Sequence, residues 1–173
     1  MDIKKSIRSI NDWPEKGVIF RDLTTLMKDP DVFAKTCDIL FERYQGKKID
    51  KVVGIDARGF VFGAVLAYKL HVGFVPIRKK GKLPCETLSE SYSLEYGKNV
   101  IEIHRDAINE GEKILIIDDL LATGGTMEAC VSLVKRLGGD ILECGFVVEL
   151  PDLNGRAKLP GVDLFAMVEF QGE

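Results

Sequence analysis

Two adjacent carboxylates open the segment with the clearest chemical pattern. Asp118 and Asp119 follow residues 114–117, four apolar residues that are typical of a buried parallel strand. Five small or hydroxyl-bearing residues follow two leucines: Ala122, Thr123, Gly124, Gly125 and Thr126. A loop of this kind before a helix lets backbone N–H groups converge on an anion, and the threonine hydroxyls add donors. Since carboxylates accept hydrogen bonds from sugar hydroxyls, the pattern predicts a site for a sugar phosphate.

A solvated turn, with Asp119 capping the next helix, is the alternative interpretation of the acidic pair. It leaves unexplained why the strand leads into a loop of small residues. No lysine follows Gly125, so the loop departs from the Walker A pattern of nucleoside triphosphate sites. We therefore expect a phosphate monoester, with ribose hydroxyls donating to Asp118 and Asp119.

A similar strand and turn occurs earlier in the chain. Asp56 ends the apolar strand pattern of residues 51–55, and Ala57 and Arg58 lead into a helical pattern. An ordinary strand-to-helix turn would explain the acid at the helix start. The N-terminus of a helix together with a guanidinium can also hold an anion, and we favour this interpretation.

A basic run, residues 78–82, contains Arg78, Lys79, Lys80 and Lys82. Most charge runs are solvated surface. This one follows a predicted parallel strand, where a basic patch would neutralise and attract a substrate with several negative charges. The run is therefore a candidate binding segment.

Alternating strands and helices must position these groups. The patterns predict strands over residues 51–56, 72–77, 113–118, 141–149 and 164–168, and helices over residues 31–44, 60–70 and 127–137. Two antiparallel strands are expected at residues 92–96 and 99–104, after a loop over residues 78–90. This alternation predicts an α/β fold, with an open, mostly parallel sheet flanked by helices. Ligands bind at the carboxyl edge of such sheets.

The chain of 173 residues is expected to form a single domain, residues 1–173. Weak helical periodicity over residues 2–10 and an extended piece at residues 18–22 predict a small N-terminal hood, residues 1–30. The loop and hairpin over residues 78–104 are expected to form a mobile lid over the carboxyl edge.

Composition excludes several classes of function. A net charge of −3 gives no general reason to expect a nucleic-acid partner. We expect no membrane span and no signal peptide, because no apolar run is long enough and residues 1–11 are charged. The four cysteines are scattered without a C-x-x-C pair, so a zinc site or a disulfide framework is not expected. A reducing cytoplasm is the expected location.

Residues 114–126 resemble the signature of type I phosphoribosyltransferases, which bind 5-phosphoribosyl 1-diphosphate (PRPP). Four further segments are similar, in order, to the adenine-specific branch of that family: residues 18–22, 56–60, 78–84 and 91–97. The resemblance covers nearly the whole chain. It implies purine salvage, in which the 5-phosphoribosyl group passes from PRPP to adenine to give AMP and pyrophosphate. It also implies a homodimer and Mg²⁺ held mainly by substrate and water, without a protein metal site.

The resemblance assigns the anionic part of the substrate. It implies that the run from Ala122 to Thr126 binds the 5-phosphate and that Asp118 and Asp119 bind the ribose. Asp56, Ala57 and Arg58 would form the diphosphate loop, which leads into a helix in that family. Lys79 and Lys82 would lie near the pyrophosphate.

The resemblance also assigns the base. Phe20 taken alone would be read as a core residue, but the family places an aromatic ring here against the purine. Backbone groups of Ile19 and Arg21 would read the edge of adenine. Glu95 and Tyr96 taken alone would be a surface pair. The resemblance places Glu95 near the purine imidazole, where it could accept a proton, and makes Tyr96 a lid residue.

Two alternatives stay open at this point. One is a phosphoribosyltransferase for another purine such as xanthine. The other is a non-catalytic regulator that senses PRPP. We expect an enzyme, because a regulator would usually carry a separate DNA-binding segment, for which 173 residues leave no room.

Overall fold

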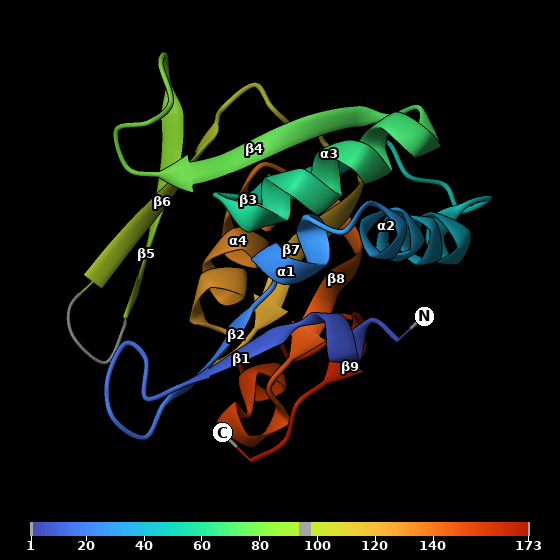
Figure 1. Ribbon diagram of the computed structural model, residues 1–173. Helices are drawn as coiled ribbons and strands as arrows, with labels where there is room; N and C mark the ends of the chain where they lie inside the picture. The colour runs from blue at the N-terminus through green and yellow to red at the C-terminus, as the bar shows by residue number, and fades with distance from the viewer. Residues whose placement is uncertain (1, 94–97, 173) are drawn as a thin grey trace.

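A mostly parallel sheet forms the centre of the molecule in the computed structural model, which describes residues 2–93 and 98–172. Within that part of the chain, seven strands follow the order β5-β6-β4-β3-β7-β8-β9 (Figure 1). The parallel strands are β3 (Lys51–Ile55), β4 (Gly73–Lys79), β7 (Lys113–Leu121), β8 (Asp140–Glu149) and β9 (Leu164–Glu169). β5 (Thr87–Ser93) and β6 (Lys98–His104) add an antiparallel edge. The predicted open α/β sheet is confirmed.

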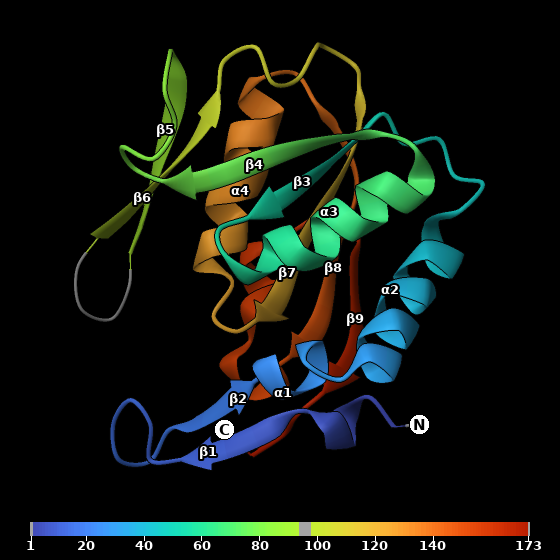
Figure 2. The same cartoon turned by 45° about the horizontal axis from the view of Figure 1, so that its top comes forward.

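Helices cover both faces of the sheet (Figure 2). α2 (Pro30–Tyr44) and α3 (Arg58–Leu70) lie on one face, and α4 (Gly125–Arg136) lies on the other. Each face encloses its own cluster of buried apolar side chains. Asp29 fixes the start of α2, since its carboxylate accepts from the backbone N–H groups of Asp31 and Val32. Among the described residues, no helix has both the length and the apolar character needed to cross a membrane.

The N-terminal segment forms a second, small sheet. A 3₁₀ turn, η1 (Lys4–Ser6), precedes β1 (Arg8–Asn11) and β2 (Ile19–Asp22), and a short helix, α1 (Thr24–Met27), follows. β1 and β2 pair antiparallel, with Arg8 opposite Asp22. The extended piece expected at residues 18–22 is confirmed. The helical pattern over residues 2–10 is mostly wrong, because pairing with β2 holds its second half as a strand.

Asp22 ties this small sheet together. Its carboxylate accepts from Arg8 Nε at 3.1 Å and from the Thr24 hydroxyl at 2.6 Å. These hydrogen bonds, first from Thr24 and then from Arg8, lower the pKa of Asp22 from its ordinary value of 3.8 to about 2. The ionised form therefore stabilises the folded state.

Asp22→Asn should lower the free energy of unfolding at pH 7 by about 1–2 kcal/mol. Because the folded pKa lies below the unfolded one, this contribution is present above pH 3.8 and is lost as the pH falls towards 2. Urea unfolding of both proteins between pH 7 and pH 3 checks the prediction. A difference that widened on acidification would contradict it.

The loop after β4 is shorter than the predicted span of residues 78–90. Residues 78–79 continue β4, and residues 87–90 belong to β5, which pairs with β6. Glu90 obscured the strand pattern because it is a charged residue on the face that packs against α4. Its carboxylate accepts from the Ser132 hydroxyl at 2.8 Å.

β7 continues three residues beyond the predicted end at Asp118. Leu120 and Leu121 stay in the sheet because they pair with Val148 and Glu149 of β8. The acidic pair therefore lies within a strand and not in the turn after it. α3 and α4 each begin two residues earlier than predicted.

Candidate functional site

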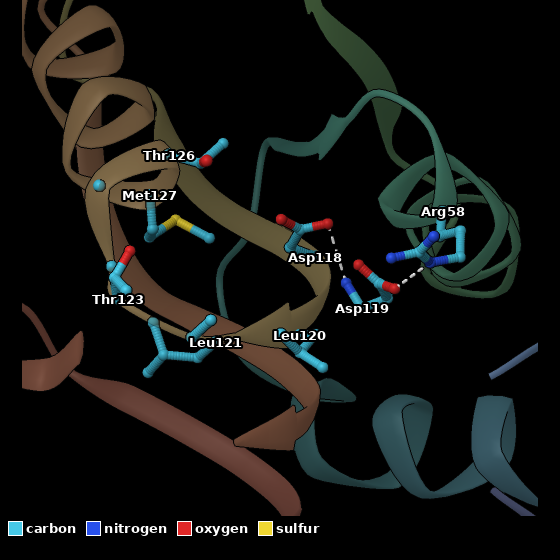
Figure 3. A pocket seen from close by; sticks show the side chains of 11 residues that line it. Arg58, Asp118, Asp119, Leu120, Leu121, Thr123, Thr126 and Met127 are labelled. Atoms are coloured by element: carbon cyan, nitrogen blue, oxygen red, sulfur yellow. Dashed lines mark hydrogen bonds and ion pairs between the residues drawn. The ribbon is translucent and has the colours of Figure 1, made fainter. Parts of the chain in front are cut away.

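A cavity of about 190 Å³ opens where β7 ends and α4 begins. Figure 3 shows side chains that line it, from β7, from the loop after it and from the start of α3. The lining residues are Arg58, Asp118, Asp119, Leu120, Leu121, Ala122, Thr123, Gly124, Gly125, Thr126 and Met127. The structure thus places the acidic pair, Arg58 and the loop predicted to bind phosphate (residues 122–126, the phosphate loop) around one cavity.

The loop presents backbone donors to this cavity. Gly124 adopts a left-handed conformation with φ of 81°, which favours glycine, and α4 starts at Gly125. The first N–H groups of a helix have no partner within it, and the helix dipole favours negative charge there. Thr123 and Thr126 carry hydroxyls at the same cavity (Figure 3). The arrangement suits a phosphate group.

The two carboxylates have different environments. Asp119 is buried and accepts from Nε of Arg58 (Figure 3). Asp118 is partly exposed, and its carboxylate accepts from the backbone N–H of Asp119 at 2.9 Å. Burial, and secondly the charge of Asp119, raises the pKa of Asp118 well above its ordinary value. The two acids therefore differ: Asp119 is ion-paired with Arg58, whereas the pKa of Asp118 is raised.

Arg58 lies among three acids. Burial alone would lower the pKa of Arg58, but the Asp119 carboxylate raises it, and Asp118 and Asp22 add to this effect. Asp22 is the last residue of β2, so the small N-terminal sheet contributes one of the charges that act on Arg58. Arg58 belongs to the expected diphosphate loop and contacts Asp119, so it links that loop to the acidic pair.

The expected diphosphate loop contacts the basic run. The peptide bond between Asp56 and Ala57 is cis. Nε of Arg78 donates to the Asp56 carboxylate at 3.2 Å, and the same guanidinium donates to the Lys82 carbonyl at 3.2 Å. Lys79 and Lys82 are exposed. The loop and the basic run therefore lie at one edge of the sheet, next to Arg58.

The residues expected at the base lie on β2. The ring of Phe20 packs edge-on against Trp13, with 4.4 Å between ring centroids. The guanidinium of Arg21 lies 4.3 Å from the centroid of Phe170, away from the cavity lining. Ile19 pairs with Asn11 of β1 and is half-buried. The side chain of Arg21 is thus engaged elsewhere, and its backbone lies opposite Ser9 of β1, so its contact with the base stays a prediction.

Glu95 and Tyr96 lie outside the described residues, so their predicted places stay predictions. Sequence reasoning missed Asp22, whose charge acts on Arg58, and it missed that Arg78 of the predicted binding run bonds to Asp56. It also missed the apolar lining residues Leu120, Leu121 and Met127. Asp22 directly follows Arg21, and Arg78 opens the basic run, so adjacency was the available signal for both.

The donors available to a metal ion are few. Within residues 2–93 and 98–172, no group of three or more His, Cys, Asp or Glu side chains could hold a metal. Asp118 and Asp119 offer carboxylate oxygens at the cavity. This donor set fits an ion such as Mg²⁺, which keeps several waters and uses one or two carboxylates beside substrate oxygens.

Comparisons with known proteins agree with this geometry. Residues 23–163 match the family model of the phosphoribosyl transferase domain. The adenine phosphoribosyltransferase of Desulfosudis oleivorans is 56% identical over 173 residues, covering 100% of both chains. The crystal structure of the Thermoanaerobacter pseudethanolicus adenine phosphoribosyltransferase superposes with a TM-score of 0.93 at 50% identity, covering 97% of this chain and 98% of that one.

A further similar structure carries ligands. The Saccharomyces cerevisiae adenine phosphoribosyltransferase, complexed with D-2,5-dideoxy-2,5-imino-altritol 1,6-bisphosphate and adenine, gives a TM-score of 0.91 at 40% identity. The alignment covers 96% of each chain.

Proposed function

The chain belongs to the phosphoribosyl transferase family, among the adenine phosphoribosyltransferases, and from this premise we propose how its residues carry out the reaction. The reaction transfers the 5-phosphoribosyl group from PRPP to adenine and yields AMP and pyrophosphate, a step of purine salvage. The observation that carries the proposal is the single cavity shared by the phosphate loop, the acidic pair and Arg58.

The phosphate loop binds the 5-phosphate of PRPP. The donors are the backbone N–H groups from Ala122 to Thr126 and the hydroxyls of Thr123 and Thr126, which line the cavity. Asp118 and Asp119 accept hydrogen bonds from the ribose hydroxyls beside it. Displacement at the anomeric carbon develops positive charge on the ribose, and the charge of these acids favours that state.

The other end of PRPP lies at the diphosphate loop. Asp56 and Ala57 shape this loop, and Arg58 with Lys79 and Lys82 stabilises the departing pyrophosphate. The hydrogen bonds from Arg78 to Asp56 and Lys82 support the view that loop and lysines act together. Arg58 exchanges its contact with Asp119 for one with the substrate when PRPP binds.

The base binds beside β2. Phe20 stacks on adenine, and backbone groups of Ile19 and Arg21 read its edge. Glu95 accepts the proton that the ring nitrogen loses on forming the glycosidic bond, and Tyr96 closes over the site. Residues 1–30 form the hood around the base, and residues 78–104 form a lid that excludes water and protects PRPP from hydrolysis.

Mg²⁺ is the proposed cofactor, held by oxygens of PRPP and by water. Asp118 or Asp119 reaches it directly or through a water molecule, since these carboxylates border the cavity. When bound, the ion neutralises negative charge on the diphosphate. The protein's own contribution is to position the ribose and the two anionic groups.

A homodimer is the proposed assembly, and the outer face of α3 supports it. Tyr68 is 85% exposed and Val61, two turns earlier on that helix, is 38% exposed. Apolar side chains are expected on a helix face that is covered by a partner. Sedimentation equilibrium should give twice the chain mass, and a monomer at micromolar concentration would contradict the proposal.

The cytoplasm stays the proposed location, which the four free cysteines support.

Turnover with PRPP and Mg²⁺ should be confined to adenine when adenine, guanine, xanthine and hypoxanthine are compared. A pocket that uses backbone groups to read the base leaves polar groups unpaired when an oxopurine binds. The unpaired groups lower kcat/KM for the oxopurine by several orders of magnitude. Release of pyrophosphate measures turnover for each base. Activity with an oxopurine alone would overturn the choice of adenine, and binding of PRPP without any turnover would indicate a regulator.

A further inference from the structure

A short segment after β8 lies against the phosphate loop from outside the cavity. It consists of two 3₁₀ turns, η2 (Pro151–Leu153) and η3 (Gly155–Lys158). A Cβ atom on Gly155 would overlap the carbonyl of Ala122 and lie 3.1 Å from the backbone nitrogen of Gly124. A Cβ atom on Gly124 would overlap the carbonyl of Gly155 in turn. The two backbones are therefore in direct contact, and the position of η3 sets the position of the loop.

An ion pair between a buried carboxylate and a partly exposed arginine holds η3 in place. Glu149 is the last residue of β8 and is only 3% exposed. Its two carboxylate oxygens accept from Nε and a terminal nitrogen of Arg156 at 2.7 and 2.6 Å. This bidentate contact raises the pKa of Arg156. Since Arg156 follows Gly155 directly, the pair fixes the residue that touches the loop.

Backbone contacts connect the same segment to the strand that leads into the loop. The N–H of Leu150 donates to the carbonyl of Leu121 at 2.9 Å, and Leu121 pairs with Glu149 across the sheet. The loop is thus bounded by β7 before it, by α4 after it and by η3 behind it.

We propose that Gly155 and the Glu149–Arg156 ion pair are positioning residues for the 5-phosphate loop. The inference rests on the proposed function, in which this loop binds the phosphate of PRPP and AMP. A buried ion pair is weak evidence for stability in itself, because its desolvation offsets the attraction between its charges. The phosphate loop must place several N–H groups around one anion, and this requires a rigid contact behind it. Displacements near 1 Å can lower catalytic rates by about a hundredfold.

The chain contains a matched control. Arg43 of α2 forms the same bidentate pair with Glu143, at 2.8 and 2.6 Å, on the same strand β8. Glu143 is 7% exposed, so both carboxylates are buried, and both arginine side chains are partly exposed, at 33% for Arg43 and 46% for Arg156. Neither Arg43 nor Glu143 lines the cavity. Breaking the Arg43–Glu143 pair therefore shows the effect of losing such an ion pair while the phosphate loop is unchanged.

The experiment compares Arg156→Ala, Arg156→Lys and Arg43→Ala with the wild-type protein. Calorimetry gives the affinity for AMP, which carries the 5-phosphate, and for pyrophosphate, which occupies the other end of the site. Arg156→Ala should weaken AMP binding by about ten- to a hundredfold, with pyrophosphate binding within about twofold. Arg156→Lys, which keeps the charge but loses the fork, should recover part of the affinity. KM for PRPP should rise more than kcat falls.

Arg43→Ala should lower the melting temperature and leave both affinities within about twofold of wild type. Equal weakening of AMP binding in Arg43→Ala and Arg156→Ala would overturn the inference, and so would wild-type affinity in Arg156→Ala. If Arg156→Ala does not fold, Arg156→Lys and Gly155→Ala decide by the same two affinities. A wild-type protein that binds no AMP would refute the proposed function instead, so the two failures are distinguishable.

Discussion

Replacing Asp118 and Asp119 together by asparagine should lower kcat for AMP formation by about three orders of magnitude or more. The removal of one preorganised electrostatic group costs about 10²–10³ in rate, and both acids border the cavity proposed to hold the ribose. The fold should survive, because asparagine keeps the shape of each side chain. Turnover is measured as pyrophosphate release, and circular dichroism checks the fold.

The single variants separate the two acids. Asp119→Asn should have the larger effect, since it also removes the ion pair with Arg58. Asp140→Asn is the control: Asp140 is ion-paired with Lys113 at the opposite end of β7. It should leave kcat within about twofold. Near-normal turnover in the double variant would contradict the assignment of these acids to the ribose.

Arg58→Ala should lower kcat/KM for PRPP by about two to three orders of magnitude. Arg58 lines the cavity, it belongs to the proposed diphosphate loop, and it already bonds to Asp119. Arg58→Lys should recover only part of the loss, because an ammonium group keeps the charge but cannot form a bidentate contact with a phosphate. Initial rates over a range of PRPP concentrations give the comparison, with Arg43→Ala as a control that removes a guanidinium away from the cavity.

A double-mutant cycle tests whether Arg58 and Asp119 act together. Their contact predicts that Arg58→Ala combined with Asp119→Asn lowers the rate by less than the product of the single effects. Independent, multiplicative losses would contradict a shared role. Wild-type kcat/KM in Arg58→Ala would remove Arg58 from the proposed mechanism.

Much of the fold followed from local pattern. The buried strands ending near residues 55, 79 and 121 were recognisable from their apolar residues, and the helices after two of them from their periodicity. The boundaries were less certain where polar residues point into the protein. Glu90 hid the start of β5 because its carboxylate bonds to Ser132 and Arg136, and the acidic pair hid the last three residues of β7 because strand β8 holds them in the sheet.

The sequence by itself determined which chemistry is present: an acidic pair, a loop of small residues and a basic run, each placed at the carboxyl end of a strand. That much follows because parallel strands bring their carboxyl ends to one edge. Only the tertiary structure decided how these groups meet. The contacts of Arg58 with Asp119 and of Arg78 with Asp56 join positions 61 and 22 residues apart. Such pairs depend on strand order and side-chain direction, which no local periodicity encodes, and the contact of Gly155 with the phosphate loop depends on them in the same way.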